Sequence, residues 1–259
     1  MGNLPCNLCT FWCACCMADF LYIKQKGIEV AYMGFIDLII RYFPSFMDAL
    51  VMTLKLAVCS LLFATVLGVI FSLFTVSNIK PLQAISAIYI DIIRGTPLLV
   101  QTFIIYYGLA GVLRPTGFAW ANIGGPFTAG VVALSLNAGA YMAEIIRGGI
   151  EAVDKGQVEA ARSLGLSYGK TMRKIILPQA FLTMLPSVIN QFIITLKDTS
   201  LISIIGIREL TQNGKIIAAN TSALVMGVWV MVAVYYLIIC TILAKIAKVV
   251  ERKISYGRR

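Results

Sequence analysis

Long apolar stretches alternate with short polar segments along most of this chain, and the alternation predicts its elements. A helix needs about 20 apolar residues to cross the hydrocarbon core of a bilayer, and five stretches are long enough. They cover residues 46–76, 82–112, 126–146, 177–205 and 223–246. The second is interrupted by Arg94-Gly95-Thr96-Pro97, a sequence that breaks a helix. The pattern therefore predicts an all-α membrane protein with five transmembrane helices.

Composition agrees with this prediction and removes several function classes. The 259 residues are 59% hydrophobic and 13% charged, too apolar for a soluble globule of this length. The chain contains no histidine, which excludes a histidine-based metal site and a Ser-His-Asp triad. No internal repeat or flexible linker is evident, so we expect one transmembrane domain over residues 41–255. A leader, 1–40, precedes it and a basic tail, 256–259, follows it.

Lysine and arginine predict the orientation, because cytoplasmic loops are enriched in them. One side holds Lys80, the 147–177 loop and the carboxyl tail, and it carries most of the basic residues outside the spans. We therefore expect the loop and the carboxyl terminus to be cytoplasmic and the amino terminus to lie outside the cell. The protein is predicted to be a multi-pass protein of a bacterial cell membrane.

The leader contains a cysteine cluster at positions 6, 9, 13, 15 and 16. Such spacing invites a zinc or disulfide interpretation, but the second, distant ligand pair of a specific zinc site is missing. We favour a non-essential leader or a start site placed too early, with the core beginning near Met33. No metal site is predicted.

The loop over residues 147–177 is a polar, basic segment between two apolar runs, and its residues predict an ordered structure. Residues 157–164 form a short amphipathic helix in which Val158, Ala161 and Leu164 share one face. Gly165 ends it as a left-handed residue, and Ser167 caps the next helix. Leu177-Pro178 then starts the fourth span. A charged, structured loop on a membrane protein indicates that a soluble partner docks there.

The same loop contains a near match to a nucleotide-binding P-loop. Only three residues separate Gly165 from Gly169, whereas a P-loop needs four and must follow a buried strand. The residues before Gly165 are a helical run instead. If the protein uses ATP, another subunit binds the nucleotide and its Mg²⁺, and this chain has no cofactor of its own.

A family resemblance follows from the spacing of the loop. The pattern E-A-A-x3-G-x9-I-x-L-P occurs at Glu159, Ala160, Ala161, Gly165, Ile175, Leu177 and Pro178. It resembles the loop by which permeases of bacterial ABC importers dock onto their ATPase subunit. The segments 91–98, 137–149 and 196–201 resemble the polar amino-acid uptake branch, which carries glutamine, glutamate, histidine, arginine and opines. The resemblance covers roughly residues 40 to 255.

The resemblance implies a type I importer permease that acts as a homodimer or heterodimer. Two ATPase subunits lie below it, and an extracellular or periplasmic substrate-binding protein delivers the amino acid from above. The chain itself is then not an enzyme. The coupling helix lies between the third and fourth spans, and the coupling residues are Glu159, Ala160, Ala161, Gly165, Leu177 and Pro178.

The translocation path should contain polar groups that the bilayer would otherwise expel. A zwitterionic amino acid needs an anion for its ammonium group, and Asp198 is the candidate, unless it only pairs with Lys197 or Arg94. Glu144 and Arg147 stand one turn apart and are expected to pair. Helix-to-helix hydrogen bonds are an equal alternative for the other polar candidates, which are Asn190, Gln191, Gln101, Asn137 and Tyr141. Arg94 and its break are a candidate gate.

The substrate is the least determined feature of the sequence. Asp198 and Glu144 are the only acidic residues in the interiors of the third and fourth spans, so a strongly cationic substrate has no dedicated site. This favours glutamine, with arginine, histidine, glutamate or cystine as alternatives. An ion-driven secondary carrier is the competing class, but such carriers usually contain an inverted repeat.

Overall fold

The computed structural model describes residues 9–77, 79–221 and 224–256, and it consists of helices joined by short turns. In chain order the helices are α1 (Cys9–Val76), α2 (Lys80–Gly95), α3 (Leu98–Phe103), α4 (Leu109–Leu113), α5 (Gly125–Glu151), α6 (Lys155–Ser163), α7 (Tyr168–Thr171), α8 (Leu177–Ile202), α9 (Leu210–Asn220) and α10 (Val225–Tyr256). Two π-helical turns, Ile104–Gly108 and Met172–Ile176, join α3 to α4 and α7 to α8.

Five stretches of the described residues are long and apolar enough to cross a membrane, which confirms the predicted number of spans. They are Gly34–Val76, Leu98–Thr116, Gly125–Glu151, Tyr168–Ile205 and Val225–Val249. The predicted second span, 82–112, is wrong in one respect, because it is two helices and only the part after Pro97 qualifies. Pro97 holds Thr96 in an extended conformation, φ −121° and ψ 143°, so α2 ends there.

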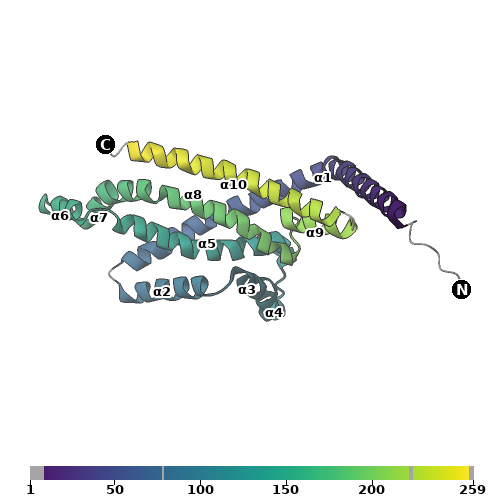
Figure 1. The fold of residues 1–259 in the computed structure, drawn as a ribbon. Coiled ribbons are helices and arrows are strands. Elements are labelled where there is room, and N and C mark those ends of the chain that lie inside the picture. Colours follow the sequence, from purple (N-terminus) through teal and green to yellow (C-terminus); the bar gives the residue numbers. More distant parts are fainter. Residues whose placement is uncertain (1–8, 78, 222–223, 257–259) are drawn as a thin grey trace, which may run out of the picture.

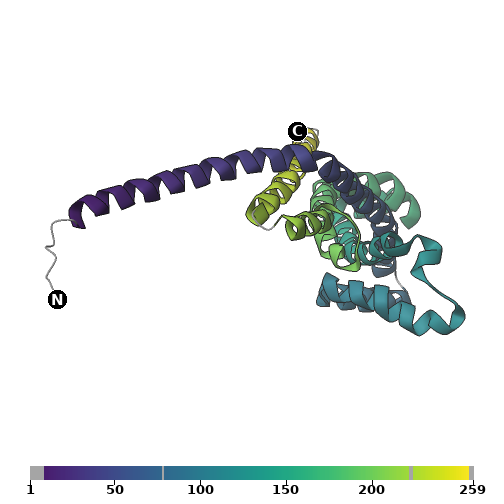
Figure 2. The same ribbon diagram turned by 90° about the vertical axis from the view of Figure 1, so that its right-hand side faces the viewer.

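The first helix is longer than the sequence predicted. α1 is continuous from Cys9, through the expected leader and past Pro44, which lies inside the helix. The helix is bent, and its amino-terminal part projects sideways from the bundle (Figure 2). A proline inside a helix removes a backbone hydrogen bond and is an ordinary cause of such a bend. The cysteine cluster of the leader lies outside the residues whose side chains the structure describes.

Helix α5 lies at the centre of the bundle, between α1, α8 and α2 (Figure 1). Its neighbours approach closely because many of its positions are alanine or glycine. A Cβ atom on Gly139 would lie 2.9 Å from Tyr89 Oη and 3.0 Å from Leu67 Cβ. The small residues of α5 therefore fix the distance between it and the surrounding helices.

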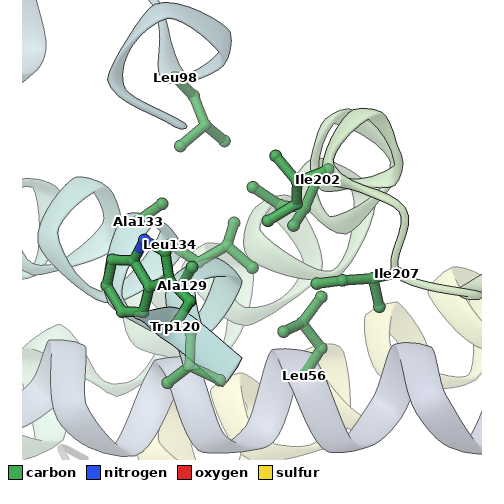
Figure 3. Close-up of a cluster of buried hydrophobic side chains, with 10 residues drawn as sticks. Leu56, Leu98, Trp120, Ala129, Ala133, Leu134, Ile202 and Ile207 are labelled. Atoms are coloured by element: carbon green, nitrogen blue, oxygen red, sulfur yellow. The ribbon is translucent and has the colours of Figure 1, made fainter. Parts of the chain in front are cut away.

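Three groups of buried apolar side chains hold the bundle together. Figure 3 shows the first, in which Leu56 of α1, Leu134 of α5 and Ile202 of α8 converge with Trp120. A second joins residues 35–50 of α1 to α9 and α10, and a third joins α5 to α8 beside α6. Helices α6 and α7 and the carboxyl end of α10 lie at one end of the bundle, and α9 lies at the other (Figure 1). We call these the α6 end and the α9 end.

Candidate functional site

A polar cavity of about 510 Å³ opens where the break between α2 and α3 faces α5 and α8. Its wall combines charged, polar and apolar side chains, namely Arg94, Gly95, Thr96, Pro97, Leu98, Asn137, Tyr141, Ile194 and Asp198. By contrast, the hollow between α1 and α5 and the one between α1 and α10 are lined mainly by apolar side chains. Arg94, Asn137, Tyr141 and Asp198, four of the predicted path residues, thus come together on three helices.

The break that forms one wall of the cavity is held by Gln101. Its Nε2 donates to the carbonyl oxygens of Ile93 at 2.7 Å and Thr96 at 3.0 Å, and to Thr96 Oγ1 at 2.9 Å. These bonds occupy carbonyl groups that the end of a helix leaves without partners. Gln101 Oε1 accepts from Asn137 Nδ2 at 3.1 Å, which ties the break to α5. Gln101 is buried and lies behind the cavity wall, so the structure gives it the helix-to-helix bond that the sequence left as an alternative.

Arg94 does not neutralise Asp198. Its Nη1 lies 3.5 Å from Glu144 Oε2, and its guanidinium carbon lies 5.5 Å from the centroid of the Tyr141 ring. No ion pair within 4.0 Å joins Asp198 to a lysine or arginine among the described side chains. The alternative in which Asp198 pairs with Lys197 or Arg94 is therefore not the arrangement found.

The predicted pair of Glu144 and Arg147 is confirmed. Arg147 Nε donates to Glu144 Oε1 at 3.2 Å and Nη2 donates to Oε2 at 2.9 Å. Arg147 Nη1 also donates to Glu151 Oε2 at 2.7 Å. The contact between Glu144 and Arg94 was missed, because the two residues lie on different helices and no local spacing connects them.

Asn190 and Gln191 lie on α8 between the α6 end and the residues that line the cavity. Neither lines it. Asn190 is exposed and precedes Ile194 and Asp198 by four and eight residues, so the three share one face of α8. Gln191 is buried. Asn190 thus continues the face of Asp198 toward the α6 end, whereas Gln191 packs inside the bundle.

The predicted loop helix is present as α6, and its start and stop have clear local causes. Asp154 Oδ1 accepts from the Gly156 amide at 2.7 Å and caps the amino end. At the other end Gly165 has φ +78°, with bonds from Gly165 N to Arg162 O at 3.0 Å and from Leu166 N to Ala161 O at 3.1 Å. This pair of bonds is the Schellman arrangement, in which a left-handed residue closes the helix.

Two expectations about the loop are wrong. Leu164 does not share the buried face with Ala161, since it is 84% exposed while Ala161 is 2% exposed. Leu164 follows the last residue of the helix, Ser163, and belongs to none of the three apolar clusters that the described residues form. Ser167 precedes α7, but its side chain makes no capping hydrogen bond.

The residues expected to dock a partner lie at the α6 end and are exposed, except Ala161, which is buried against the bundle. Glu159 and Ala160 are exposed on α6, and Leu164 and Tyr168 add large apolar side chains beside them. Leu177 and Pro178 are also exposed, but they belong to the first turn of α8, beyond the π-helical turn. Exposed apolar groups on a polar loop are typical of a protein-docking surface.

α6 is also tied directly to α8. Gln179 Nε2 donates to Gln157 Oε1 at 2.6 Å and to the Ile175 carbonyl at 3.1 Å. Val158 and Met172 pack against the third apolar cluster. A movement of α6 would therefore reach the start of α8 through both polar and apolar contacts.

A buried polar cluster at the α9 end was not predicted. Glu209 caps α9, since its carboxylate accepts from the amides of Thr211 at 2.8 Å and Gln212 at 2.7 Å. Tyr236 Oη on α10 also donates to it at 2.9 Å. Burial raises the pKa of Glu209 above its ordinary value, although these hydrogen bonds act in the opposite direction. An acid directly before a helical run was the local signal that could have suggested the cap.

The fold, the broken helix beside a polar cavity and the exposed loop helix define a membrane transport subunit that works with a soluble partner. Residues 64–256 match the family model of the binding-protein-dependent transport system inner membrane component, and the chain belongs to this family. It is therefore the permease subunit of an amino-acid ABC importer, in which a separate ATPase hydrolyses ATP.

Relatives of known name narrow the branch. The chain is 41% identical over 213 residues to the glutamine transport system permease protein GlnP of Escherichia coli K12, covering 82% of this chain and 94% of that one. It is 39% identical over 212 residues to the arginine transport system permease protein ArtQ of Bacillus subtilis 168, covering 82% and 93%.

A solved structure described as an amino acid ABC transporter with histidines has a TM-score of 0.77 and 40% identity to this chain. It covers 85% of this chain and 98% of that one. The methionine transporter MetNI, at a TM-score of 0.60 and 17% identity, shares the fold.

Proposed function

We propose that the permease carries a polar amino acid, with glutamine as the favoured substrate, through the cavity between the α2–α3 break, α5 and α8. The observation that carries the proposal is the polar wall, in which Asp198 has no basic partner within ion-pair distance among the described side chains. Its carboxylate is available for the ammonium group of an amino acid. The cavity volume is in the range of small-molecule sites in proteins, about 300–1,000 Å³.

The charges of the cavity favour a substrate whose side chain is neutral. Glu144, the other acidic residue in the interiors of these two spans, is engaged by Arg94 and Arg147. A cationic substrate such as arginine would need a second free acid, and a glutamate side chain would need a second free base. The relatives are named for four different substrates: arginine, cystine, glutamine and nopaline. The choice among substrates is therefore tested by competition.

We further propose that the α6 end faces the cytoplasm and docks onto the ATPase through Glu159, Ala160, Leu164 and Tyr168. The α9 end then receives the binding protein, and a second permease chain completes the transport path. A green fluorescent protein fused after Arg259 should fluoresce, because it folds to its fluorescent form in the cytoplasm. A dark but membrane-inserted fusion contradicts the orientation.

The substrate is tested with the complex co-purified with its ATPase and binding protein and reconstituted in liposomes. We expect ATP-dependent uptake of labelled glutamine, with unlabelled glutamine competing better than arginine, histidine, glutamate or cystine. Asp198→Asn should lower uptake strongly, while Lys55→Gln, at an exposed position of α1, should not. If arginine competes far better than glutamine, the substrate assignment is wrong.

A further inference from the structure

The charged side chains beside the cavity form a continuous chain that begins in its wall. Glu144 Oε2 is shared, lying 3.5 Å from Arg94 Nη1 and 2.9 Å from Arg147 Nη2. Arg147 continues the chain to Glu151, at 2.7 Å. Glu151 is the last residue of α5, three residues before the cap of α6. Ionic contacts thus extend from the cavity to the start of the loop that bears α6.

The contact at the cavity end of this chain is the loosest. At 3.5 Å it is longer than the roughly 2.7–2.9 Å of a strong charge-assisted hydrogen bond, whereas the contacts of Arg147 with Glu144 Oε2 at 2.9 Å and with Glu151 Oε2 at 2.7 Å fall in that range. The Arg94 side chain is 43% exposed, against 27% for Glu144. Because a guanidinium has five N–H donors, Arg94 retains donors that can serve a ligand in the cavity.

The two opposite charges of the cavity wall match the two charges of a zwitterion. Asp198 on α8 supplies the anion and Arg94 at the end of α2 supplies the cation. A guanidinium binds a carboxylate through two parallel hydrogen bonds, a geometry that Glu144 does not achieve with Arg94 here. The α-carboxylate of a bound amino acid can therefore replace Glu144 as the partner of Arg94.

We propose that Arg94 binds the α-carboxylate of the substrate and that Glu144 is a built-in competitor which holds Arg94 while the cavity is empty. This inference rests on the proposed transport of an amino acid through the cavity. When the substrate binds, Glu144 keeps its two bonds to Arg147, so it is not left as an unpaired charge. Release of Arg94 removes one positive charge from the row of ion pairs that runs through Glu144 and Arg147 to Glu151, beside the α6 loop.

The test measures equilibrium binding of labelled glutamine to the purified permease–ATPase complex without its binding protein. Unlabelled glutamine and glutamine α-carboxamide, which lacks the carboxylate, are compared as competitors. For the unmodified complex we expect the amide to compete at least about tenfold more weakly, equivalent to 1.4 kcal/mol or more. In Arg94→Gln this preference should fall to less than about twofold, within the range of a weak exposed ion pair.

The variant Glu144→Gln shows whether Glu144 competes with the substrate for Arg94 or only supports the structure. It should bind glutamine several-fold more tightly than the unmodified complex and keep the preference for the carboxylate, because Arg94 loses its competitor. Arg208→Gln, at an exposed position next to Glu209, is the matched control and should match the unmodified complex. If the Arg94→Gln permease does not assemble with its ATPase, the glutamine affinity of the Glu144→Gln complex alone tests the inference.

Two results overturn the inference: an Arg94→Gln complex that retains the full preference, or an assembled Glu144→Gln complex that binds glutamine more weakly. If labelled arginine binds in place of glutamine, the proposed substrate is wrong. Arginine and its α-carboxamide then test Arg94 and Glu144 in the same way, so the two failures are distinguishable.

Discussion

Gln179 at the start of α8 donates a hydrogen bond to Gln157 on α6 across 2.6 Å, and this bond joins the docking loop to a helix that lines the cavity. Asp198 lies on the same helix, five turns further along at about 3.6 residues a turn. The bond therefore gives the α6 surface a direct hydrogen-bonded link to the helix that carries Asp198. Its loss is expected to weaken coupling without removing either site.

Gln157→Ala tests this link. A partly exposed hydrogen bond contributes at most about 1 kcal/mol, so the amount of substrate moved per ATP should fall by up to about fivefold. The measurement compares uptake and ATP hydrolysis in the same liposomes. Gln83→Ala, which removes another glutamine bond near the α6 end, to the Ser77 carbonyl at 2.6 Å, should keep the ratio of the unmodified protein. An unchanged ratio in Gln157→Ala would show that apolar packing alone carries the motion.

Gly165→Ala should uncouple transport from ATP hydrolysis. The position has φ +78°, and a side chain there costs about 1–2 kcal/mol, which is relieved if the turn after α6 rearranges. Uptake should fall several-fold while the protein still inserts into the membrane and co-purifies with less ATPase. The matched control is Gly169→Ala, because this glycine is helical and a Cβ atom there meets nothing within 4 Å. Normal coupling in Gly165→Ala would remove the turn from the coupling assignment.

Gly139→Ala and Gly148→Ala are both on α5 and should have opposite effects on stability. The Cβ atom of the first would lie 2.9 Å from Tyr89 Oη, whose bond to the Leu136 carbonyl fixes it, so we expect a loss of about 1–3 kcal/mol. A Cβ atom on Gly148 meets nothing within 4 Å, and alanine should stabilise the helix by up to about 1 kcal/mol. Thermal unfolding of the purified protein in detergent measures both changes. A melting temperature that does not fall in Gly139→Ala would contradict the close approach.

Glu209 should make the stability of the α9 end depend on pH. Burial raises its pKa in the folded state, so the folded protein holds this proton more tightly than the unfolded chain does. Its contribution is fully present below the unfolded pKa of 4.5 and is lost as the pH rises through the raised folded value. The melting temperature should therefore fall as the pH rises from below the unfolded pKa through the raised folded pKa.

Glu209→Gln should flatten this pH dependence, because an amide does not titrate. Asp37→Asn, which alters an exposed carboxylate on the amino-terminal part of α1, should leave the slope in place. A slope that persists unchanged in Glu209→Gln would assign it to another group.

Local patterns predicted much of this structure because their causes are local. The apolar runs are recognised by their length, the stop at Gly165 by its left-handed backbone, and the break by the extended conformation that Pro97 imposes on Thr96. The bonds between Glu144 and Arg147 followed from their spacing of three residues. The stop, the break and the ion pair are each decided within about one or two turns of helix, and each apolar run is continuous along the sequence.

Features that depend on distant residues were not predictable in the same way. Gln101 and Asn137 are 36 residues apart, and only the packed bundle shows that they bond to each other, with Asn137 in the cavity wall and Gln101 outside it. The contact of Arg94 with Glu144 has the same origin. The exposure of Leu164 was missed because it depends on which parts of the bundle pack against the end of α6, and the helix ends at Ser163, one residue earlier than expected.

The central position of α5 also determines where this protein tolerates change. In an apolar stretch of 18 residues of α5, 72% of the residues are buried against the rest of the chain, compared with 17% in α10. Most side chains on α10 do not have to fit against other helices of this chain, whereas a side chain on α5 must fit a space already shaped by three neighbouring helices. In a saturation library selected for transport, α5 should therefore accept few residue types at most positions, and α10 should accept almost any apolar one.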